Sequence, residues 1–299
     1  MTPRPILGIG SATWDRFVMV PEFPMDEGVT RCLATAEDGG GPVATALCTL
    51  SALGGQAILL DAQGDDATGL RIYEDLAMFG IDTSLMERHG GCASAQASIL
   101  VRERDGARHI CFMPATCPEL SPESIPETIV QGASLLHLNG RHEAAARRAA
   151  LLAKAAGVPV SFDGGAGRWR ESLRDLVLAS DVRIVAKDFA LRFTNTDDLE
   201  VAACALRADS PALVVITDGV RGSWVFSGAG ECFHEPAFPV SPVVDTTGCG
   251  DVFHGAFLHG WLQRWSLRET ASFAAKLAAK TALGLGGRCA LRLGTVSAL

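Results

Sequence analysis

The sequence lacks three features that would each indicate a particular class of protein. Its 299 residues contain no Lys/Arg-rich run and carry a formal net charge of −8, and polyanions need a basic surface. No apolar stretch approaches the roughly 20 residues that cross a bilayer. The first residues lack the long apolar segment and cleavage site of a secretory signal. We therefore expect no nucleic-acid partner, no membrane span and a cytoplasmic location.

Paired cysteines are also missing. The nine cysteines include no CxxC pair and none at zinc-ligand spacing with a histidine. This pattern is typical of reduced thiols in a cytosolic protein. With 48% hydrophobic and 20% charged residues, the composition predicts a large buried core and excludes wholesale disorder.

The second half of the chain alternates between helical and strand-like patterns. Amphipathic or Ala-rich segments of 9 to 15 residues alternate with short, wholly apolar ones. Apolar strands separated by helices predict a parallel sheet covered on both faces. The expected fold is α/β, with a doubly wound, mainly parallel sheet flanked by helices. The helical segments are 142–156, 171–179 and 197–208, and the strands are 158–162, 183–186 and 212–216.

Two segments, about 14–38 and 92–113, alternate polar and apolar residues instead. Strands exposed on one face have this pattern, so we expect a small antiparallel β lid that projects from the core. Arg104-Asp105-Gly106-Ala107 predicts a hairpin turn inside the second segment. No linker or internal repeat divides residues 1–299, so the sequence predicts one domain with a lid.

The most informative stretch surrounds a glycine-rich turn, Thr247-Gly248-Cys249-Gly250-Asp251. Apolar residues recur after it at helical spacing, so a helix should begin near Gly250. Helix N-termini expose backbone N–H groups that bind anions when side-chain bulk is absent. A carboxylate there suits a general base beside a phosphoryl group. The alternative from the residues alone is an ordinary N-cap aspartate.

The run Asp-Thr-Thr-Gly-x-Gly-Asp-x-Phe-x-Gly-Ala-Phe over residues 245–257 resembles the C-terminal signature of the ribokinase-like (PfkB) carbohydrate kinases. The resemblance implies that Asp251 is the catalytic base and that the backbone of Gly248, Cys249 and Gly250 forms an anion hole. Cys249 stands where relatives usually have Ala. It also implies a monovalent-cation (K⁺) site at Asp245 and Thr247. His254, one helical turn after the base, is expected to be structural or solvent-facing.

A second glycine run, Gly39-Gly40-Gly41, precedes a helix and resembles the family's N-terminal signature. Glycines allow a ligand to approach the backbone closely, although a plain tight turn is the alternative. The resemblance places Gly40, Gly41 and Thr45 at the sugar, with Thr45 where relatives often have Asn. It also implies that Asp15 accepts hydrogen bonds from sugar hydroxyls. From the sequence alone, Asp15 would be a solvated loop residue.

The segment 216–223 ends an apolar strand and resembles the family's nucleotide-binding Thr-x-Gly-x-x-Gly motif, with Thr217, Gly219 and Gly222 as its residues. The family's Asn-x-x-Glu element is absent, since Ala186-Lys187-Asp188-Phe189 stands in its place. Lys187 is expected either to reach nucleotide phosphates or to form a surface ion pair.

Two further runs refine the resemblance. The segment 136–142 is similar to that of ketohexokinases and places Asn139 and Arg141 at the sugar, with a simple loop role as the alternative. Gly286-Gly287-Arg288 is similar to sulfofructose-kinase-like members.

The resemblance implies an ATP- and Mg²⁺-dependent kinase for a small carbohydrate, with a ketose as the first choice, and possible homodimers through the lid, a habit of the family. A nucleoside kinase of the same fold and a non-catalytic sugar sensor remain alternatives. A dinucleotide-binding oxidoreductase is less favoured, because Thr13 occupies the third glycine position after Gly8-x-Gly10.

Overall fold

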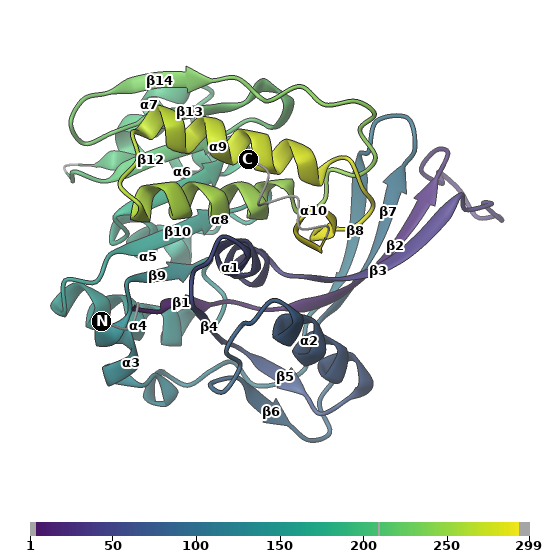
Figure 1. The fold of residues 1–299 in the computed structure, drawn as a ribbon, viewed down its shortest axis with the longest axis horizontal. Helices are drawn as coiled ribbons and strands as arrows, with labels where there is room; N and C mark the ends of the chain where they lie inside the picture. Colours follow the sequence, from purple (N-terminus) through teal and green to yellow (C-terminus); the bar gives the residue numbers. More distant parts are fainter. Residues whose placement is uncertain (1–3, 209, 293–299) are drawn as a thin grey trace.

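The computed structural model describes residues 4–208 and 210–292, and its largest element is an eight-stranded sheet (Figure 1). Six neighbouring strands run parallel, and the last two join antiparallel at one edge. In spatial order they are β14 (Cys232–Glu235), β13 (Ser223–Phe226), β12 (Leu213–Thr217), β11 (Val182–Ala186), β10 (Val160–Gly164), β9 (Leu135–Leu138), β1 (Ile6–Ile9) and β4 (Ala57–Leu60).

Both faces of this sheet are buried. Along β12, Val214 and Ile216 point into one apolar cluster, and Leu213 and Val215 point into the other. The first cluster is covered by α3 (Glu127–Gly132), α4 (Glu143–Ala155), α5 (Arg174–Leu178), α6 (Lys187–Thr194) and α7 (Leu199–Arg207). The second is covered by α1 (Pro42–Ala52), α2 (Ala67–Met78), α8 (Cys249–Leu262), α9 (Leu267–Thr281) and the short α10 (Cys289–Arg292). The predicted doubly wound α/β fold is confirmed.

The predicted segments match these elements to within two or three residues, with one exception. Residues 171–179 form a 3₁₀ turn, Glu171–Leu173, followed by the short α5. Single 3₁₀ turns are common where α-helices begin. The other 3₁₀ turns of the described residues are Pro122–Ser124 and Gly219–Arg221.

The lid is a separate four-stranded sheet, which extends away from the core in Figure 1. Its order is β3 (Ala34–Gly40), β2 (Thr13–Val20), β7 (Gln96–Arg102) and β8 (Arg108–Met113). The predicted turn at 104–107 joins the antiparallel β7 and β8. The prediction of a wholly antiparallel lid is wrong, because the central pair, β2 and β7, is parallel. Both strands leave the core side by side, where the Trp14 amide donates to the Ala95 carbonyl at 3.1 Å.

A further parallel pair, β5 (Ala62–Gly64) and β6 (Glu87–His89), follows β4. Among residues 4–208 and 210–292, no helix combines the length and apolarity that a bilayer span would need.

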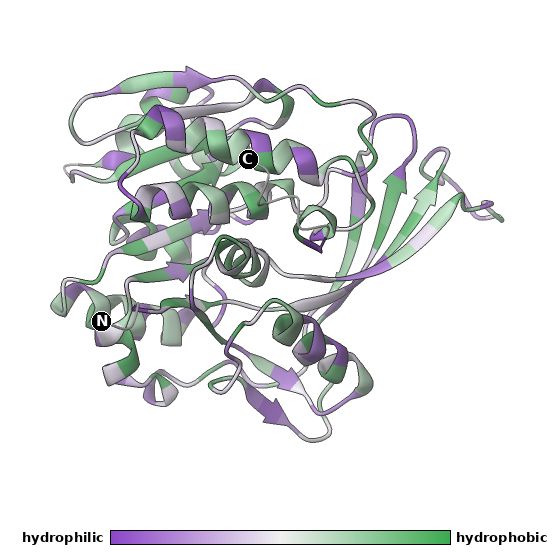
Figure 2. Cartoon of the chain, in the orientation of Figure 1, coloured by the Kyte–Doolittle hydropathy of each residue, from purple (hydrophilic) through white to green (hydrophobic). Residues whose placement is uncertain are grey.

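The carboxyl ends of the parallel strands all lie at one edge of the main sheet. In Figure 2 the arrowheads of β9 and β10 are purple, in contrast to the mostly green strands around them. Polar groups therefore gather where these strands end. In open α/β sheets, ligands bind at this edge.

Candidate active site

Helix α8 begins beside this edge, at the residue the sequence predicted to within one position. Its N-cap is Gly248, with φ of 74°, and Cys249 is its first residue. A Cβ atom at Gly248 would lie 2.4 Å from the carbonyl oxygen of Gly287, so only glycine fits there. A Cβ at Gly250 would meet nothing within 4 Å. The amides of this first turn therefore border open space, which suits an anion.

Asp251 lies in the first turn of the same helix. Burial, together with the nearby charge of Asp163, raises the pKa of its carboxyl to about 6, although Arg168 and His254 oppose the shift. At neutral pH most of this carboxylate is still ionised. A carboxylate with a pKa just below the working pH is well matched to accepting a proton.

His254 follows one turn later and is 4% exposed, so the solvent-facing alternative is wrong. Its Nδ1 atom lies 3.8 Å from Oδ1 of Asp163, at the end of β10. The structure thus places this histidine inside the protein, below the first turn of α8.

The loop before α8 contains the predicted cation site. Asp245 is fully buried, and its two carboxylate oxygens accept hydrogen bonds from the amides of Thr247, at 2.8 Å, and Gly286, at 3.0 Å. The Thr247 hydroxyl is buried and finds no hydrogen-bond partner among the described residues. A buried carboxylate and an unpaired hydroxyl are hard oxygen ligands that fit an alkali cation.

The lid contacts this loop directly. The carbonyl oxygen of Gly106, in the β7–β8 turn, accepts hydrogen bonds from the amide of Thr246, at 3.0 Å, and from its hydroxyl, at 2.8 Å. Arg108 donates to the Thr246 hydroxyl at 3.1 Å. The positive charge of Arg108 also lowers the pKa of Asp251. A lid cation therefore lies close enough to affect the candidate base.

Asp15 is the predicted sugar ligand on β2. It is 7% exposed, and Thr13 donates a hydrogen bond to it at 2.7 Å. Burial raises the pKa of Asp15 to about 6, and the charges of Asp38 and Asp251 push it in the same direction. Because the charge of Asp251 contributes to the raised pKa of Asp15, the candidate sugar ligand and the candidate base lie in one region.

The glycines predicted to contact the sugar adjoin Asp15. Gly40 ends β3, and a Cβ there would lie 2.0 Å from Oδ2 of Asp15. Gly41 has φ of 91°, and a Cβ there would lie 2.1 Å from the carbonyl oxygen of Ser11. Glycine is therefore required where the lid joins α1, which accounts for the run without any ligand.

Thr45 is 1% exposed, and its hydroxyl accepts a hydrogen bond from Nε of Arg288 at 3.1 Å. Arg288 is also buried and donates to the Gly40 carbonyl at 2.7 Å and to Asp75. Its own amide donates to Asp38 at 2.9 Å. The hydroxyl of Thr45, a predicted sugar ligand, is therefore already hydrogen-bonded to Arg288, which lies near the C-terminal end of the described residues.

Asn139 and Arg141 lie in the loop after β9. Oδ1 of Asn139 accepts a hydrogen bond from the Arg141 amide at 3.1 Å, so Asn139 shapes its own loop. The side chain of Arg141 is 34% exposed and lies 3.9 Å from Glu119. Both are at the sheet edge where ligands bind, and a role toward the sugar stays a prediction.

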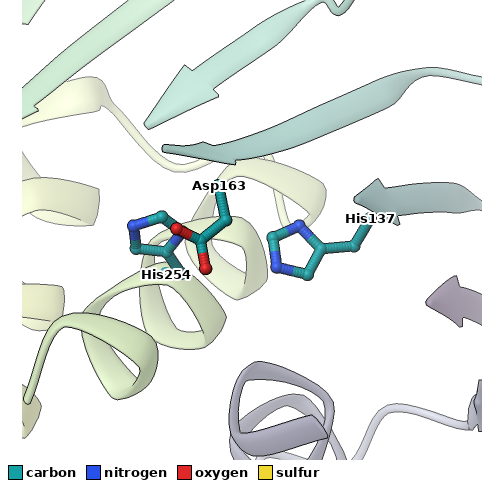
Figure 3. A group of neighbouring side chains, drawn as sticks. All are labelled: His137, Asp163 and His254. Carbon is teal, nitrogen blue, oxygen red and sulfur yellow. The ribbon is translucent and has the colours of Figure 1, made fainter. Parts of the chain in front are cut away.

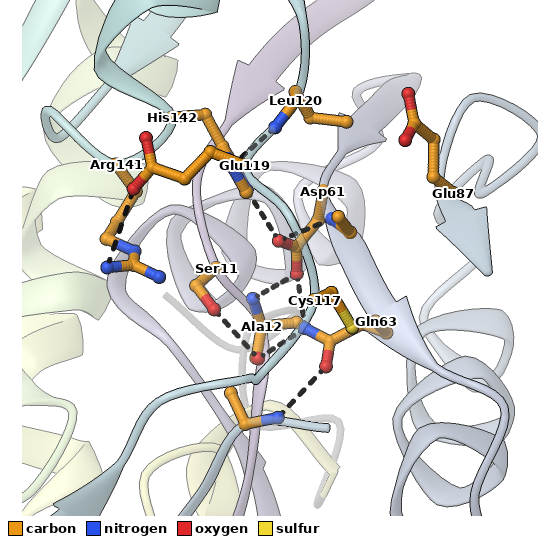
Figure 4. Close-up of polar contacts among 12 residues, drawn as sticks. Ser11, Ala12, Asp61, Gln63, Glu87, Cys117, Glu119, Leu120, Arg141 and His142 are labelled. Atoms are coloured by element: carbon orange, nitrogen blue, oxygen red, sulfur yellow. Dashed lines mark hydrogen bonds and ion pairs between the residues drawn. The ribbon is translucent and has the colours of Figure 1, made fainter. Parts of the chain in front are cut away.

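A polar cluster beneath this loop fixes the point where the lid leaves the core (Figure 4). Asp61 accepts hydrogen bonds from the Ala12 amide and from His142, each at 2.8 Å, and from Gln63 at 2.5 Å. Gln63 also donates to the Ala12 carbonyl at 2.9 Å. Nδ1 of His142 accepts a hydrogen bond from the Leu120 amide, so the ring hydrogen is on Nε2, which donates the hydrogen bond to Asp61. Ala12 is thus held through both of its backbone polar groups.

The predicted nucleotide residues lie at the ends of β11 and β12. Lys187 begins α6, and its Nζ lies 3.1 Å from Oδ2 of Asp218, so the ion-pair alternative for Lys187 is confirmed. Thr217 ends β12, and Gly219 and Gly222 bound the turn that follows. Beside them is a cavity of about 400 Å³, which is lined by Lys187, Leu199, Asp218, Arg221, Trp224 and His234. The Trp224 and His234 rings form part of its wall, with their centroids 4.5 Å apart and their planes tilted by 42°.

Three groups that the sequence analysis did not assign belong to this region. Arg168 lies near both Asp163 and Asp251 and opposes the rise of their pKa values. Arg288 and Asp61 hold the two ends of the lid, as described above. Arg288 directly follows the Gly286-Gly287 pair, but no neighbouring residue in the sequence indicates that its side chain is buried among carboxylates.

Comparison with known proteins decides the family. Residues 5–291 match the pfkB family carbohydrate kinases. The chain belongs to this family. It is 28% identical over 98% of its length to the ATP-dependent ribose-1-phosphate kinase of Halopiger xanaduensis, covering 97% of that protein. It is 23% identical to the ketohexokinase of Mus musculus, over 94% of this chain and 96% of that one.

Solved structures agree with the fold. A putative ribokinase from Agrobacterium tumefaciens superposes with a TM-score of 0.89 and 25% identity, covering 99% of this chain and 97% of that one. A putative ribokinase II from E. coli, solved with ATP and Mg²⁺, superposes with a TM-score of 0.83 at 21% identity, with 97% of each chain covered. This pfkB protein is a phosphotransferase that acts on sugar hydroxyl groups.

Proposed function

We propose that this pfkB kinase transfers the γ-phosphoryl group of ATP to a hydroxyl of a small sugar, with a ketose as the expected substrate. The observation that carries the proposal is the position of Asp251, an ionisable base in the open first turn of α8 whose charge reaches Asp15. The sugar would lie between Asp15 and Asp251, with ATP along the strand ends toward Lys187.

In the proposed reaction, the sugar hydroxyl oxygen attacks the γ-phosphorus and the bond to the β-phosphate oxygen breaks, releasing ADP. Asp251 accepts the hydroxyl proton as the new P–O bond forms. The amides of Gly248, Cys249 and Gly250 stabilise the charge on the transferred group. Arg108 and Arg168, whose charges already act on Asp251, add to this stabilisation. Closure of the lid over the sugar would exclude water as a competing acceptor.

Two cations belong to the proposal. Mg²⁺, as bound with ATP in the E. coli relative, supplies charge neutralisation at the terminal phosphates. Lys187, which Asp218 holds in an ion pair beside the cavity, would orient those phosphates through its ammonium group. A monovalent cation such as K⁺ would bind at Asp245 and the unpaired hydroxyl of Thr247, next to the anion hole.

A substrate panel tests the proposal most directly. ADP release is measured with ATP and Mg²⁺ against ketoses, aldoses, their phosphates and nucleosides, each with and without K⁺. The highest kcat/KM is expected for a ketose. A nucleoside that exceeds every sugar would establish the alternative acceptor. Ligand binding without ADP release from any compound would instead support a non-catalytic sensor and contradict the proposal.

The rate should depend on pH through the buried carboxyls. The base must be ionised to act, and burial raises its pKa to about 6. We therefore expect kcat/KM to be constant above about pH 7 and to fall as the pH drops through about 6. Asp15 has a raised pKa of about 6 as well, so the slope of log kcat/KM against pH should lie between one and two in acid. A profile that stays flat from about pH 5 to 8 would contradict the assignment.

We also propose that two copies associate through the lid. Ile110 and Phe112 on the outer strand β8 are 48% and 50% exposed, and they face the same way as the buried Ile99 and Ala97 of β7. A second lid would cover this apolar surface. The molar mass in solution, compared between the native chain and Phe112→Asp, tests this: the variant should shift toward the monomer.

A further inference from the structure

Three buried side chains meet below the first turn of α8, outside the groups used for phosphoryl transfer. His137 comes from β9, Asp163 from the end of β10 and His254 from α8. Their exposed fractions are 0%, 3% and 4%. Figure 3 shows the Asp163 carboxylate between the two imidazole rings. One potential ligand atom of each residue lies within 4.8 Å of the other two.

The hydrogen bonds of His137 fix its proton. The parallel register of β9 and β10 places Ser161 opposite His137, and Nδ1 lies 2.8 Å from the Ser161 hydroxyl. That hydroxyl donates to the Leu136 carbonyl, at 3.5 Å, so it accepts from the histidine. Nδ1 therefore carries the hydrogen, and Nε2 presents a lone pair toward the cluster.

All three side chains leave an atom unpaired at the same place. Nε2 of His137, Oδ2 of Asp163 and Nδ1 of His254 are buried and have no hydrogen-bond partner among the described residues. The 3.8 Å between His254 Nδ1 and Asp163 Oδ1 is too long for a hydrogen bond. Buried polar atoms without partners are costly and rare in proteins. Three of them facing one another call for a shared partner.

We propose that this cluster binds one divalent transition-metal ion, with zinc as the expected metal. Two imidazole nitrogens and one carboxylate oxygen are a ligand set that zinc takes at about 2.0–2.2 Å, with a fourth position left for water. Tetrahedral bonds of this length put ligand atoms roughly 3.3 Å apart. The ligand atoms lie within 4.8 Å of one another, so small side-chain rotations complete the site.

The hydrogen-bond partner of His137 also suits a metal ligand. A ligating histidine donates its other N–H to a neighbouring oxygen, which fixes the ring and makes the free nitrogen a better ligand. Ser161 takes this role for His137. The negative charge of the buried Asp163 favours a divalent ion at the cluster, and the exposed Arg168 is a nearby cation that opposes it.

This site differs in kind from the magnesium that accompanies ATP. Mg²⁺ prefers six oxygen ligands and keeps several waters, whereas two of these three ligands are nitrogens. The proposed ion would join β9, β10 and α8 directly beneath the candidate base. It would therefore act as a positioning element, holding the first turn of α8 against the ends of the strands.

The test is a zinc titration of the full chain after removal of metal with a chelator. We expect one zinc ion per chain and a higher melting temperature on loading. Cobalt(II) in place of zinc should give the visible absorption of a four-coordinate site without thiolate-to-cobalt charge transfer. This last readout separates the cluster from any binding by the nine cysteines, because thiolates are zinc ligands as well.

His254→Phe and His137→Phe remove one ligand each and replace it with an apolar ring that suits a buried position. Each is expected to weaken zinc binding about tenfold or more. His259→Phe, on the same helix but outside the cluster, should bind zinc as the native chain does. The proposal is overturned if the native chain takes up no zinc, if cobalt reports thiolate ligation, or if folded ligand variants bind zinc with native affinity. The first two readouts need no variant, so they decide the question even where a variant fails to fold.

Discussion

Asp251→Asn is expected to lower kcat by about 10²–10⁴-fold, the usual contribution of a general base. The carboxamide fills the same space at the start of α8 but cannot accept the hydroxyl proton at neutral pH. Because the anion-hole amides and Asp15 remain, the affinities for ATP and sugar should change little. Coupled ADP assays give kcat, and calorimetric titration gives the two dissociation constants.

The matched control is Asp175→Asn, the same substitution at a side chain that is 88% exposed on α5. It should leave kcat and both affinities unchanged. If Asp251→Asn retained more than about a tenth of the native kcat, a general-base role for that residue would be untenable. A large loss of ATP affinity with unchanged kcat would point to nucleotide binding instead.

The second large effect concerns stability. Arg288→Met should lower the free energy of unfolding by about 3 kcal/mol, the lower end of the range for breaking a buried ion pair. Methionine fills similar space but leaves the Gly40 carbonyl, the Thr45 hydroxyl and one oxygen of Asp75 without their donor. Arg292 still pairs with Asp75, which limits the loss. Urea unfolding followed by circular dichroism measures it.

Arg148→Met is the control, because the Arg148 side chain is 48% exposed and its ion pair with Glu127 is long, at 3.8 Å. It should change the unfolding free energy by no more than about 0.5 kcal/mol. The double variant Arg288→Met/Asp75→Leu should recover part of the loss, since it also removes the buried carboxylate that lost one of its two partners. Equal stabilities for Arg288→Met and Arg148→Met would show that the buried network contributes nothing.

The elements that could be predicted are those whose signals are local. The start of α8 was predictable because glycines, a carboxylate and helical spacing follow one another within a few residues. The parallel sheet was predictable because its strands are apolar on both faces. The turn at Gly106 was predictable from its Asp-Gly pair.

The parts that escaped prediction depend on distant pairings. The β2–β7 register joins residues about 80 positions apart, and nothing in either strand indicates a parallel neighbour. The resemblance assigned Thr45 to the sugar, but nothing near it in the sequence indicated its buried partner Arg288, which is 243 positions away. His137 and His254 are far apart in the sequence, and only the fold brings them to either side of Asp163.

The contact of Gly287 with Gly248, together with the reach of Arg288 to Gly40, has a consequence for synthesis. The turn at Gly248 and the point where the lid joins α1 are both completed by residues that the ribosome adds more than 35 positions after Asp251. A growing chain that already carries Asp251 still lacks the walls around it. Both contacts come from Gly287 and Arg288, just before α10, so we expect the candidate base to gain its surroundings only after these residues have been synthesised.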